Sequence, residues 1–251
     1  MGYKEDLQSS TNLSELFNVW KNKPACNVEY IKKKSKIQLT IDHGNNYFIA
    51  DGIVDYSTWN NSGNKKILFI LKEAYGKDWG DYTLASWLGD ENGEKMSHAM
   101  WRRVARWVYG ISNTSESNIA KYIPELTKQQ HFSALRSIAV LNLKKSDGQS
   151  GSDYEEINAY AENDRDEIKK ELSLIDADII VCGSTFKTLY ETVYEHKDGL
   201  GENANDNWFY YLNLDGKERL YIDYYHPANQ WPDLINYYAI TNIYQQALLS
   251  R

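Results

Sequence analysis

The sequence predicts a single α/β domain with three layers (αβα), in which helices cover both faces of a central, mainly parallel four-stranded sheet. From Lys65 onward, short apolar runs alternate with amphipathic stretches, which is typical of βαβ units whose strands are buried on both faces. The chain has 251 residues, of which 42% are hydrophobic and 25% charged, enough to bury one sizeable core. No internal repeat divides it. We therefore expect one domain over residues 1–251.

The first part of the chain, residues 1–64, is expected to form an N-terminal cap or hairpin region, and residues 65–251 the α/β core. A helix is predicted around Leu13 to Trp20, followed by extended segments near Ile37–Ile41 and Tyr47–Val54. Between the two extended segments lie His43-Gly44-Asn45-Asn46, residues typical of a turn.

The core contains four apolar runs of strand length. They predict the strands Ile67–Leu71, Ile138–Leu143, Ile179–Cys182 and Leu220–Tyr224. In parallel sheets ligands bind beyond the carboxyl ends of the strands, so polar residues at those ends are the first candidates for a site.

Helices are predicted between these strands from apolar residues at helical spacing: Met100, Val104, Trp107 and Val108, then Ile157, Tyr160, Ile168, Leu172 and Ile175. Ser184 or Thr185 is expected to cap a helix running to about Glu195. A last helix follows Pro232, and we expect it to turn Leu234, Ile235, Tyr238 and Ile243 inward.

Composition excludes several classes of protein. The longest apolar run is far too short to cross a bilayer, and acidic Glu5 and Asp6 lie where a secretory signal needs an apolar segment, so we expect a cytoplasmic protein without membrane contact. Two cysteines cannot form a disulfide framework, and the scattered histidines give no metal-ligand spacing. Phosphate-binding and dinucleotide-binding glycine motifs are absent. No metal or organic cofactor is predicted.

The charge balance, 28 basic against 35 acidic residues, gives a net charge of −7 and argues against indiscriminate adhesion to nucleic acid. A local basic face is compatible with that balance, although a solvated surface is the favoured interpretation of each basic cluster. The clusters are Lys32 to Lys36, Lys65 with Lys66, Arg102 with Arg103 and Arg106, and Lys144 with Lys145.

Polar residues interrupt or follow three of the predicted strands. Glu73 comes directly after the first strand, and Asn142 lies within the apolar second one. A buried amide needs hydrogen-bonding partners, and asparagine offers both a donor and an acceptor, which suits recognition of a base edge. His226 follows the last strand, and Pro227 holds it in an extended conformation. We expect these three side chains to meet around one cavity of nucleobase size.

In this order and spacing, the segments from about Asp51 to the C-terminus resemble the uracil-DNA glycosylase superfamily. The first strand of its best-known branch ends in Gly-Gln-Asp-Pro-Tyr, where this chain has Leu71-Lys72-Glu73-Ala74-Tyr75. The family's Leu-Leu-Leu-Asn strand corresponds to Val140-Leu141-Asn142, and its His-Pro motif corresponds to His226-Pro227. The resemblance implies that Glu73 orients water, that Tyr75 closes the base pocket, that Asn142 reads the base and that His226 supports the charge on the departing base.

The chain departs from the family pattern at three places, the third being the base-stacking aromatic, where Trp87 lies one position from the place that the family pattern gives it. Glu73 stands where the family has Asp or Asn, and Ala228-Asn229-Gln230-Trp231 replaces a Ser-Pro-Leu segment whose leucine wedges into the duplex. We expect Gln230 or Trp231 to take over the wedge. Trp87 is the candidate for stacking on the base, with Trp79 and Tyr82 as rivals, while core packing is the alternative for all three.

The hypothesis from the sequence is a DNA glycosylase that flips a uracil or other modified base out of DNA and hydrolyses its N-glycosidic bond, as in base excision repair. Lys144 and Lys145 would contact phosphates or a substituent of the base. The expected partner is DNA, single- or double-stranded, and the protein would act as a monomer. Two alternatives stay open, a catalytically silent binder of modified DNA or of a protein partner, and a hydrolase of free nucleosides or nucleotides.

Overall fold

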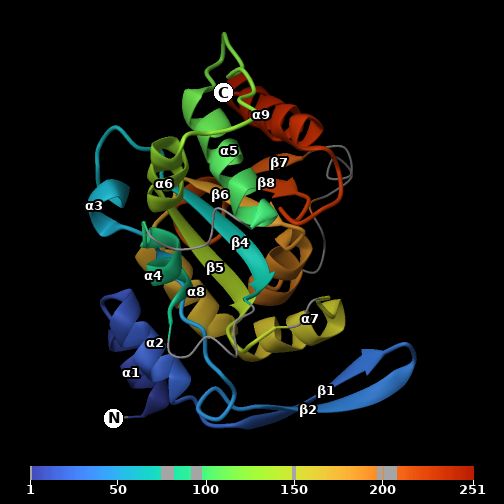
Figure 1. Ribbon diagram of the computed structural model, residues 1–251. Helices are drawn as coiled ribbons and strands as arrows, with labels where there is room; N and C mark the ends of the chain where they lie inside the picture. Colours follow the sequence, from blue (N-terminus) through green and yellow to red (C-terminus); the bar gives the residue numbers. More distant parts are fainter. Residues whose placement is uncertain (1, 75–81, 92–97, 149–150, 197–199, 201–207) are drawn as a thin grey trace.

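The computed structural model describes residues 2–74, 82–91, 98–148, 151–196, 200 and 208–251. Within these residues the chain forms a mixed α/β structure around a six-stranded sheet of order β3-β5-β4-β6-β8-β7 (Figure 1). The six strands are β3 (Gly52–Ile53), β4 (Ile67–Glu73), β5 (Ile138–Lys144), β6 (Ile179–Gly183), β7 (Phe209–Asn213) and β8 (Glu218–Tyr224).

The inner strands β5, β4, β6 and β8 run parallel, whereas β3 and β7 pair antiparallel at the two edges. All four predicted core strands are therefore present. The expected four-stranded sheet is nevertheless wrong in its strand number, because two edge strands extend it and make it mixed. Parallel pairing aligns Glu73 with Lys144, and Leu71 with Asn142, at one end of the sheet.

Helices cover both faces of the sheet and enclose two apolar cores. One core packs alternate strand residues such as Phe69, Val140 and Ile222 against α4 (Leu84–Gly89), α5 (Ala99–Asn113), α6 (Lys128–Arg136) and α9 (Asp233–Leu249). The other packs Leu68, Leu141 and their neighbours against α1 (Tyr3–Ser9), α2 (Leu13–Lys21), α7 (Tyr154–Asn163), α8 (Arg165–Ile175) and η3 (Thr188–Val193). The short α3 spans Tyr56–Trp59. Residues of opposite parity on each strand thus feed opposite cores.

The N-terminal region differs from expectation in its pairing. The hairpin joins β1 (Cys26–Lys32) to β2 (Ser35–Ile41) through Lys33 and Lys34, both with positive φ, and it projects from the body of the molecule (Figure 1). The predicted segment Tyr47–Val54 does not pair with β2. Its residues Gly52 and Ile53 join the main sheet as β3 instead, so the first 64 residues supply part of the core architecture.

The last helix begins where predicted, after Pro232, but its orientation differs. Leu234, Ile235 and Tyr238 are exposed, whereas Asn236, Tyr237, Ile240, Thr241, Tyr244 and Ala247 face inward. Apolar residues occur on both sides of this helix, so their spacing alone did not determine the buried face. Among the described helices, none combines the length and the apolar character that a membrane crossing requires.

Candidate active site

A pocket of about 300 Å³ lies beyond the carboxyl ends of β4 and β5. Glu73, Asn142 and His226 all line it, so the three residues predicted from separate strand ends come together. The remaining lining is mainly apolar and aromatic: Leu71, Ala74, Tyr82, Leu84, Trp87, His98, Met100 and Trp101. An apolar cavity with a few convergent polar groups is typical of a small-molecule or nucleobase site.

Glu73 is the last residue of β4, and its side chain is only 7% exposed. Lys144 Nζ lies 3.0 Å from Glu73 Oε2 and 2.7 Å from Glu156 Oε1, so one ammonium bridges two carboxylates. Burial alone would lower the pKa of Lys144, but the hydrogen bond with Glu156 and the charge of Glu73 raise it above its ordinary value. Together the three groups carry a net negative charge beside the pocket.

The backbone of Gly148 lies close to the side chain of Glu73. A Cβ at position 148 would lie 2.6 Å from Glu73 Cγ and 2.7 Å from its Cδ, closer than any side chain permits. The backbone N–H of Gly148 donates to the carbonyl of Ala74 at 2.7 Å, which fastens the loop against the end of β4. The carboxylate of Glu73 can therefore occupy its position only because residue 148 has no side chain.

Asn142 lies within β5 and is 1% exposed. Its backbone N–H and its side-chain Nδ2 both donate to Oδ2 of Asp51, at 2.7 and 3.1 Å. Its amide oxygen Oδ1 is buried and accepts no hydrogen bond from any described residue. Leaving such an acceptor unpaired costs about 1–3 kcal/mol, so this oxygen is a candidate to bind a donor on a ligand.

His226 follows β8, and one hydrogen bond holds its backbone while another holds its ring. Its backbone N–H donates to Ser184 Oγ at 3.0 Å, and its Nδ1 accepts the backbone N–H of Ala228 at 3.2 Å. Burial and the charge of Lys72 lower the pKa of His226 to about 4, so the ring is neutral at physiological pH. With Nδ1 acting as acceptor, the proton of the neutral ring lies on Nε2, which is then a donor.

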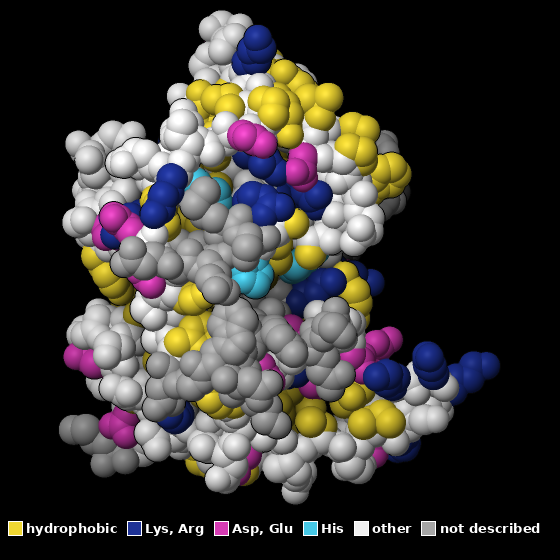
Figure 2. Space-filling view, in the orientation of Figure 1, with side chains coloured by type: hydrophobic (Ala, Val, Ile, Leu, Met, Phe, Trp, Pro, Cys, Tyr) yellow, Lys and Arg dark blue, Asp and Glu magenta, His cyan; other side chains and the backbone are white. Residues whose placement is uncertain are grey.

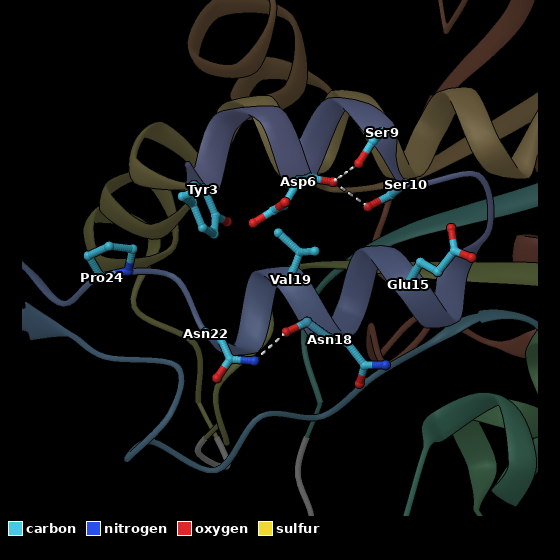
Figure 3. A pocket seen from close by; sticks show the side chains of 9 residues that line it. All are labelled: Tyr3, Asp6, Ser9, Ser10, Glu15, Asn18, Val19, Asn22 and Pro24. Atoms are coloured by element: carbon cyan, nitrogen blue, oxygen red, sulfur yellow. Dashed lines mark hydrogen bonds between the residues drawn. The ribbon is translucent and has the colours of Figure 1, made fainter. Parts of the chain in front are cut away.

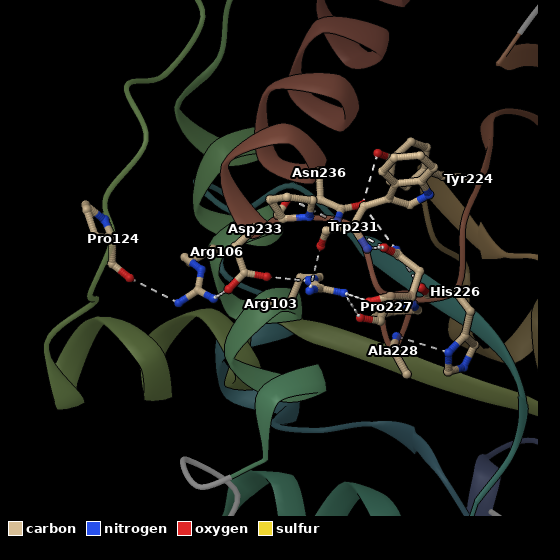
Figure 4. Close-up of polar contacts among 12 residues, drawn as sticks. Arg103, Arg106, Pro124, Tyr224, His226, Pro227, Ala228, Trp231, Asp233 and Asn236 are labelled. Carbon is tan, nitrogen blue, oxygen red and sulfur yellow. Dashed lines mark hydrogen bonds and ion pairs between the residues drawn. The ribbon is translucent and has the colours of Figure 1, made fainter.

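The loop after His226 is held by an arginine and an asparagine (Figure 4). Arg103 donates to the carbonyls of Pro227, Asn229 and Trp231 and to the carboxylate of Asp233. Asn236, which is fully buried, donates to the carbonyl of Trp231 and exchanges hydrogen bonds with the side chain of Asn229. These contacts fix the His-Pro segment on α5 and α9.

The aromatic candidates fall into two groups. Trp87 lines the pocket, where its ring makes edge contacts with His98 at 5.3 Å and Trp101 at 6.3 Å between centroids. Its rival Tyr82 also lines the pocket. Tyr75 and Trp79 lie outside the described residues.

The predicted phosphate contacts of Lys144 and Lys145 are contradicted by their surroundings. Lys145 is fully buried between the carboxylates of Asp51 and Glu171, and Lys144 is committed to Glu73 and Glu156. Lys144 ends the buried strand β5 and Lys145 follows it, and both turn inward because nearby carboxylates balance their charges.

The other predicted DNA-contacting residues, Gln230 and Trp231, lie on the loop after His226, and the side chain of Trp231 is 57% exposed. The basic cluster of α5 behaves differently from a solvated face, since Arg103 and Arg106 both pair with Asp233. In Figure 2, lysine and arginine side chains gather at the projecting end of the hairpin and above the middle of this face, mixed with acidic ones.

Three polar residues of the site are not marked by any motif in the sequence. Asp51 holds Asn142, Ser184 holds His226, and His98 lines the pocket. Ser184 was expected to cap a helix, but it adopts a positive φ of 57° and directs its hydroxyl to His226 instead. This arrangement needs a glycine at position 183, because a Cβ there would lie 2.8 Å from a methyl group of Leu71 and 3.2 Å from Pro227.

Two larger cavities lack such a constellation. A groove of about 610 Å³ lies between α1 and α2 (Figure 3), but Ser9 and Ser10 bond to the carbonyl of Asp6 and Tyr3 bonds to Glu167. An open cavity of about 690 Å³ beneath the hairpin has a mostly polar lining that includes Lys144 and Glu156. Within the described residues, no group of three or more His, Cys, Asp or Glu side chains is placed to hold a metal ion.

The chain matches no known family profile and no curated protein.

Proposed function

We propose that this protein is a DNA glycosylase, which binds a flipped uracil or other modified base in the pocket beyond β4 and β5 and hydrolyses its N-glycosidic bond. The observation that carries the proposal is the convergence of Glu73, Asn142 and His226 on one small, largely apolar pocket. All three belong to the segments in which the chain resembles the uracil-DNA glycosylase superfamily.

Binding begins with extrusion of the nucleotide, which costs a few kcal/mol of lost stacking and pairing. The apolar and aromatic lining, with Trp87 among it, compensates by contact with the faces of the base. Asn142 Oδ1, buried and without a described partner, accepts an N–H from the edge of the base. Both contacts need a base that has left the helix, so they select the flipped state.

Cleavage of the glycosidic bond leaves positive charge on the sugar and negative charge on the departing base. Glu73 is the carboxylate that lines the pocket, and Lys144 holds it there, so Glu73 stabilises the sugar cation and orients the attacking water. His226, neutral and with its proton on Nε2, donates a hydrogen bond to the base as the negative charge develops.

Release of free base from oligonucleotides that carry uracil or another modified base tests the proposal. The Glu73→Gln variant is expected to lose at least about 100-fold in rate, because it removes the negative charge but keeps the shape. Glu156→Gln is the matched control: it removes a carboxylate from the same lysine without altering the pocket lining, and we expect it to stay within about tenfold of the wild type. Equal activity of the wild type, Glu73→Gln and Glu73→Ala would refute the assignment.

A hydrolase of free nucleosides or nucleotides is the second candidate. Pairing of Lys144, Lys145, Arg103 and Arg106 inside the protein favours it, because it reduces the positive charge that a DNA backbone needs. Turnover of deoxyuridine but not of a uracil-containing oligonucleotide would select this candidate. Tight binding of modified DNA without base release would select a silent binder instead.

A further inference from the structure

The contact between Asp51 and Asn142 fixes which end of the amide faces the pocket. Oδ2 of Asp51 accepts two hydrogen bonds from Asn142, one from the backbone and one from Nδ2. A carboxylate accepts but does not donate, so the nitrogen of the amide, and not its oxygen, must lie on the side of Asp51. The oxygen is left on the other side, without a described partner.

A buried lysine holds the other carboxylate oxygen of Asp51. Nζ of Lys145 donates to Oδ1 of Asp51 and lies 2.7 Å from Oε2 of Glu171, and all three side chains are buried. Burial and the proximity of Asp51 raise the pKa of Glu171 well above its ordinary value. Both oxygens of Asp51 are therefore engaged as acceptors, Oδ1 by Lys145 and Oδ2 by Asn142.

We propose that Asp51 is a specificity-determining residue that acts through Asn142: by holding the amide nitrogen, it leaves Oδ1 as a fixed acceptor for the base in the pocket. The inference rests on the proposed function. The substrate class that follows is a base with a ring N–H beside a carbonyl, namely a 4-oxopyrimidine such as uracil or a 6-oxopurine such as hypoxanthine. With the ring nitrogen of the base opposite Oδ1, cytosine and adenine place a lone pair against it and are disfavoured, although their amino groups are themselves donors.

The variant Asp51→Asn tests the orientation of the amide. Lys145 can only donate, so it draws the oxygen of the new amide side chain at position 51 toward itself and turns the nitrogen of that amide toward Asn142. The amide of Asn142 then loses its fixed orientation and can present its own N–H to the pocket. The matched control is Glu171→Gln, which alters the same buried cluster but makes no contact with Asn142.

The measurement is the single-turnover rate of base release from two oligonucleotides that differ only in carrying uracil or cytosine at one position. In the wild type we expect a strong preference for uracil. Asp51→Asn is expected to reduce the uracil-to-cytosine ratio by roughly 10- to 100-fold, the effect of losing one good polar contact to a base. Glu171→Gln should leave that ratio within about threefold. An unchanged ratio in folded Asp51→Asn, or an equal change in Glu171→Gln, would overturn the inference.

Two further arms cover failure of folding and failure of the proposed function. If Asp51→Asn does not fold, Asp51→Ala combined with Lys145→Met removes the carboxylate and leaves no unpaired lysine, and the same loss of selectivity is expected. If the wild type releases no base at all, the proposed function fails, and binding of free uracil and cytosine is measured by quenching of tryptophan fluorescence. A preference for uracil that Asp51→Asn abolishes then supports the role of Asp51, and equal binding of the two bases refutes it.

Discussion

Replacing His226 with glutamine should change how the stability of the protein depends on pH. In the folded protein, burial and the nearby Lys72 lower the pKa of His226 from 6.5 to about 4. The unfolded chain therefore takes up a proton at this residue at a higher pH than the folded protein does. The contribution of the neutral His226 to the free energy of unfolding is fully present above pH 6.5. It is lost as the pH falls from 6.5 toward 4, because only the unfolded chain takes up the proton in that window.

The magnitude follows from the two pKa values. Their full difference corresponds to roughly 3 kcal/mol, and linkage predicts that about 2 kcal/mol of this is lost between pH 7.5 and pH 5. His226→Gln removes the titrating group. The variant should therefore lose about 2 kcal/mol less than the wild type over the same change in pH, whatever the other titrating groups contribute to both proteins.

Urea unfolding at the two pH values, followed by tryptophan fluorescence, measures this difference. His196→Gln is the matched control, since His196 is exposed and its ring stacks on Tyr190 outside the pocket. We expect His196→Gln to follow the wild type. Should His226→Gln lose as much free energy of unfolding as the wild type does, the neutral buried imidazole assigned to the site would be wrong.

Three further predictions concern the site and its surroundings. Gly148→Ala should reduce base release at least about tenfold, because the added methyl group displaces Glu73, and a rate like that of the wild type would contradict the steric argument. Burial raises the pKa of Asp223 to about 6, so Asp223→Asn should raise the free energy of unfolding at pH 7.5 by about 1–2 kcal/mol, a gain that shrinks toward pH 4; urea unfolding at both pH values checks it. Replacing exposed Lys33 and Lys34 together with glutamine should weaken binding of a single-stranded oligonucleotide and lower the slope of log K against log salt by about 1, as measured by fluorescence anisotropy; an unchanged slope would exclude the hairpin from the DNA contact.

The core of the fold was predictable because its strands are buried on both faces. Each of the four inner strands centres on an apolar run of strand length, interrupted only by Asn142 in β5 and Asp223 in β8. In a chain that alternates such runs with amphipathic stretches, they indicate a buried parallel sheet. The edge strand β3 has only two residues of the extended segment predicted over Tyr47–Val54, too few to show that it joins the main sheet. β7 is only partly buried, so its pattern does not separate it from a loop. The hairpin turn was missed because Lys33-Lys34 lacks the glycine or asparagine that usually occupies positive φ.

The residues of the site could be predicted where they lie at the ends of parallel strands, but not where they depend on contacts between distant parts of the chain. Parallel pairing brings the ends of β4 and β5 together, so Glu73 and Asn142 could be assigned to one edge from sequence order alone. Asp51 lies in an irregular segment, and its role depends on a contact across 91 residues of sequence. Lys145 follows the same strand as Asn142 and was expected at the surface, where lysines usually lie, because the carboxylates that balance it occur far away in the chain.

The buried charges of this protein orient the polar groups of the pocket more than they stabilise the fold. An ion pair in a protein interior is often no more stabilising than apolar residues of the same volume, since desolvation offsets the attraction. The pair of Lys145 and Asp51 therefore stabilises the fold no more than methionine and leucine would at the same positions. What apolar side chains cannot do is hold the nitrogen of Asn142 or, in the case of Lys144, fix the carboxylate of Glu73 beside the same pocket. Two adjacent lysines at the end of β5 each orient one polar group of the pocket, which is why both turn away from solvent.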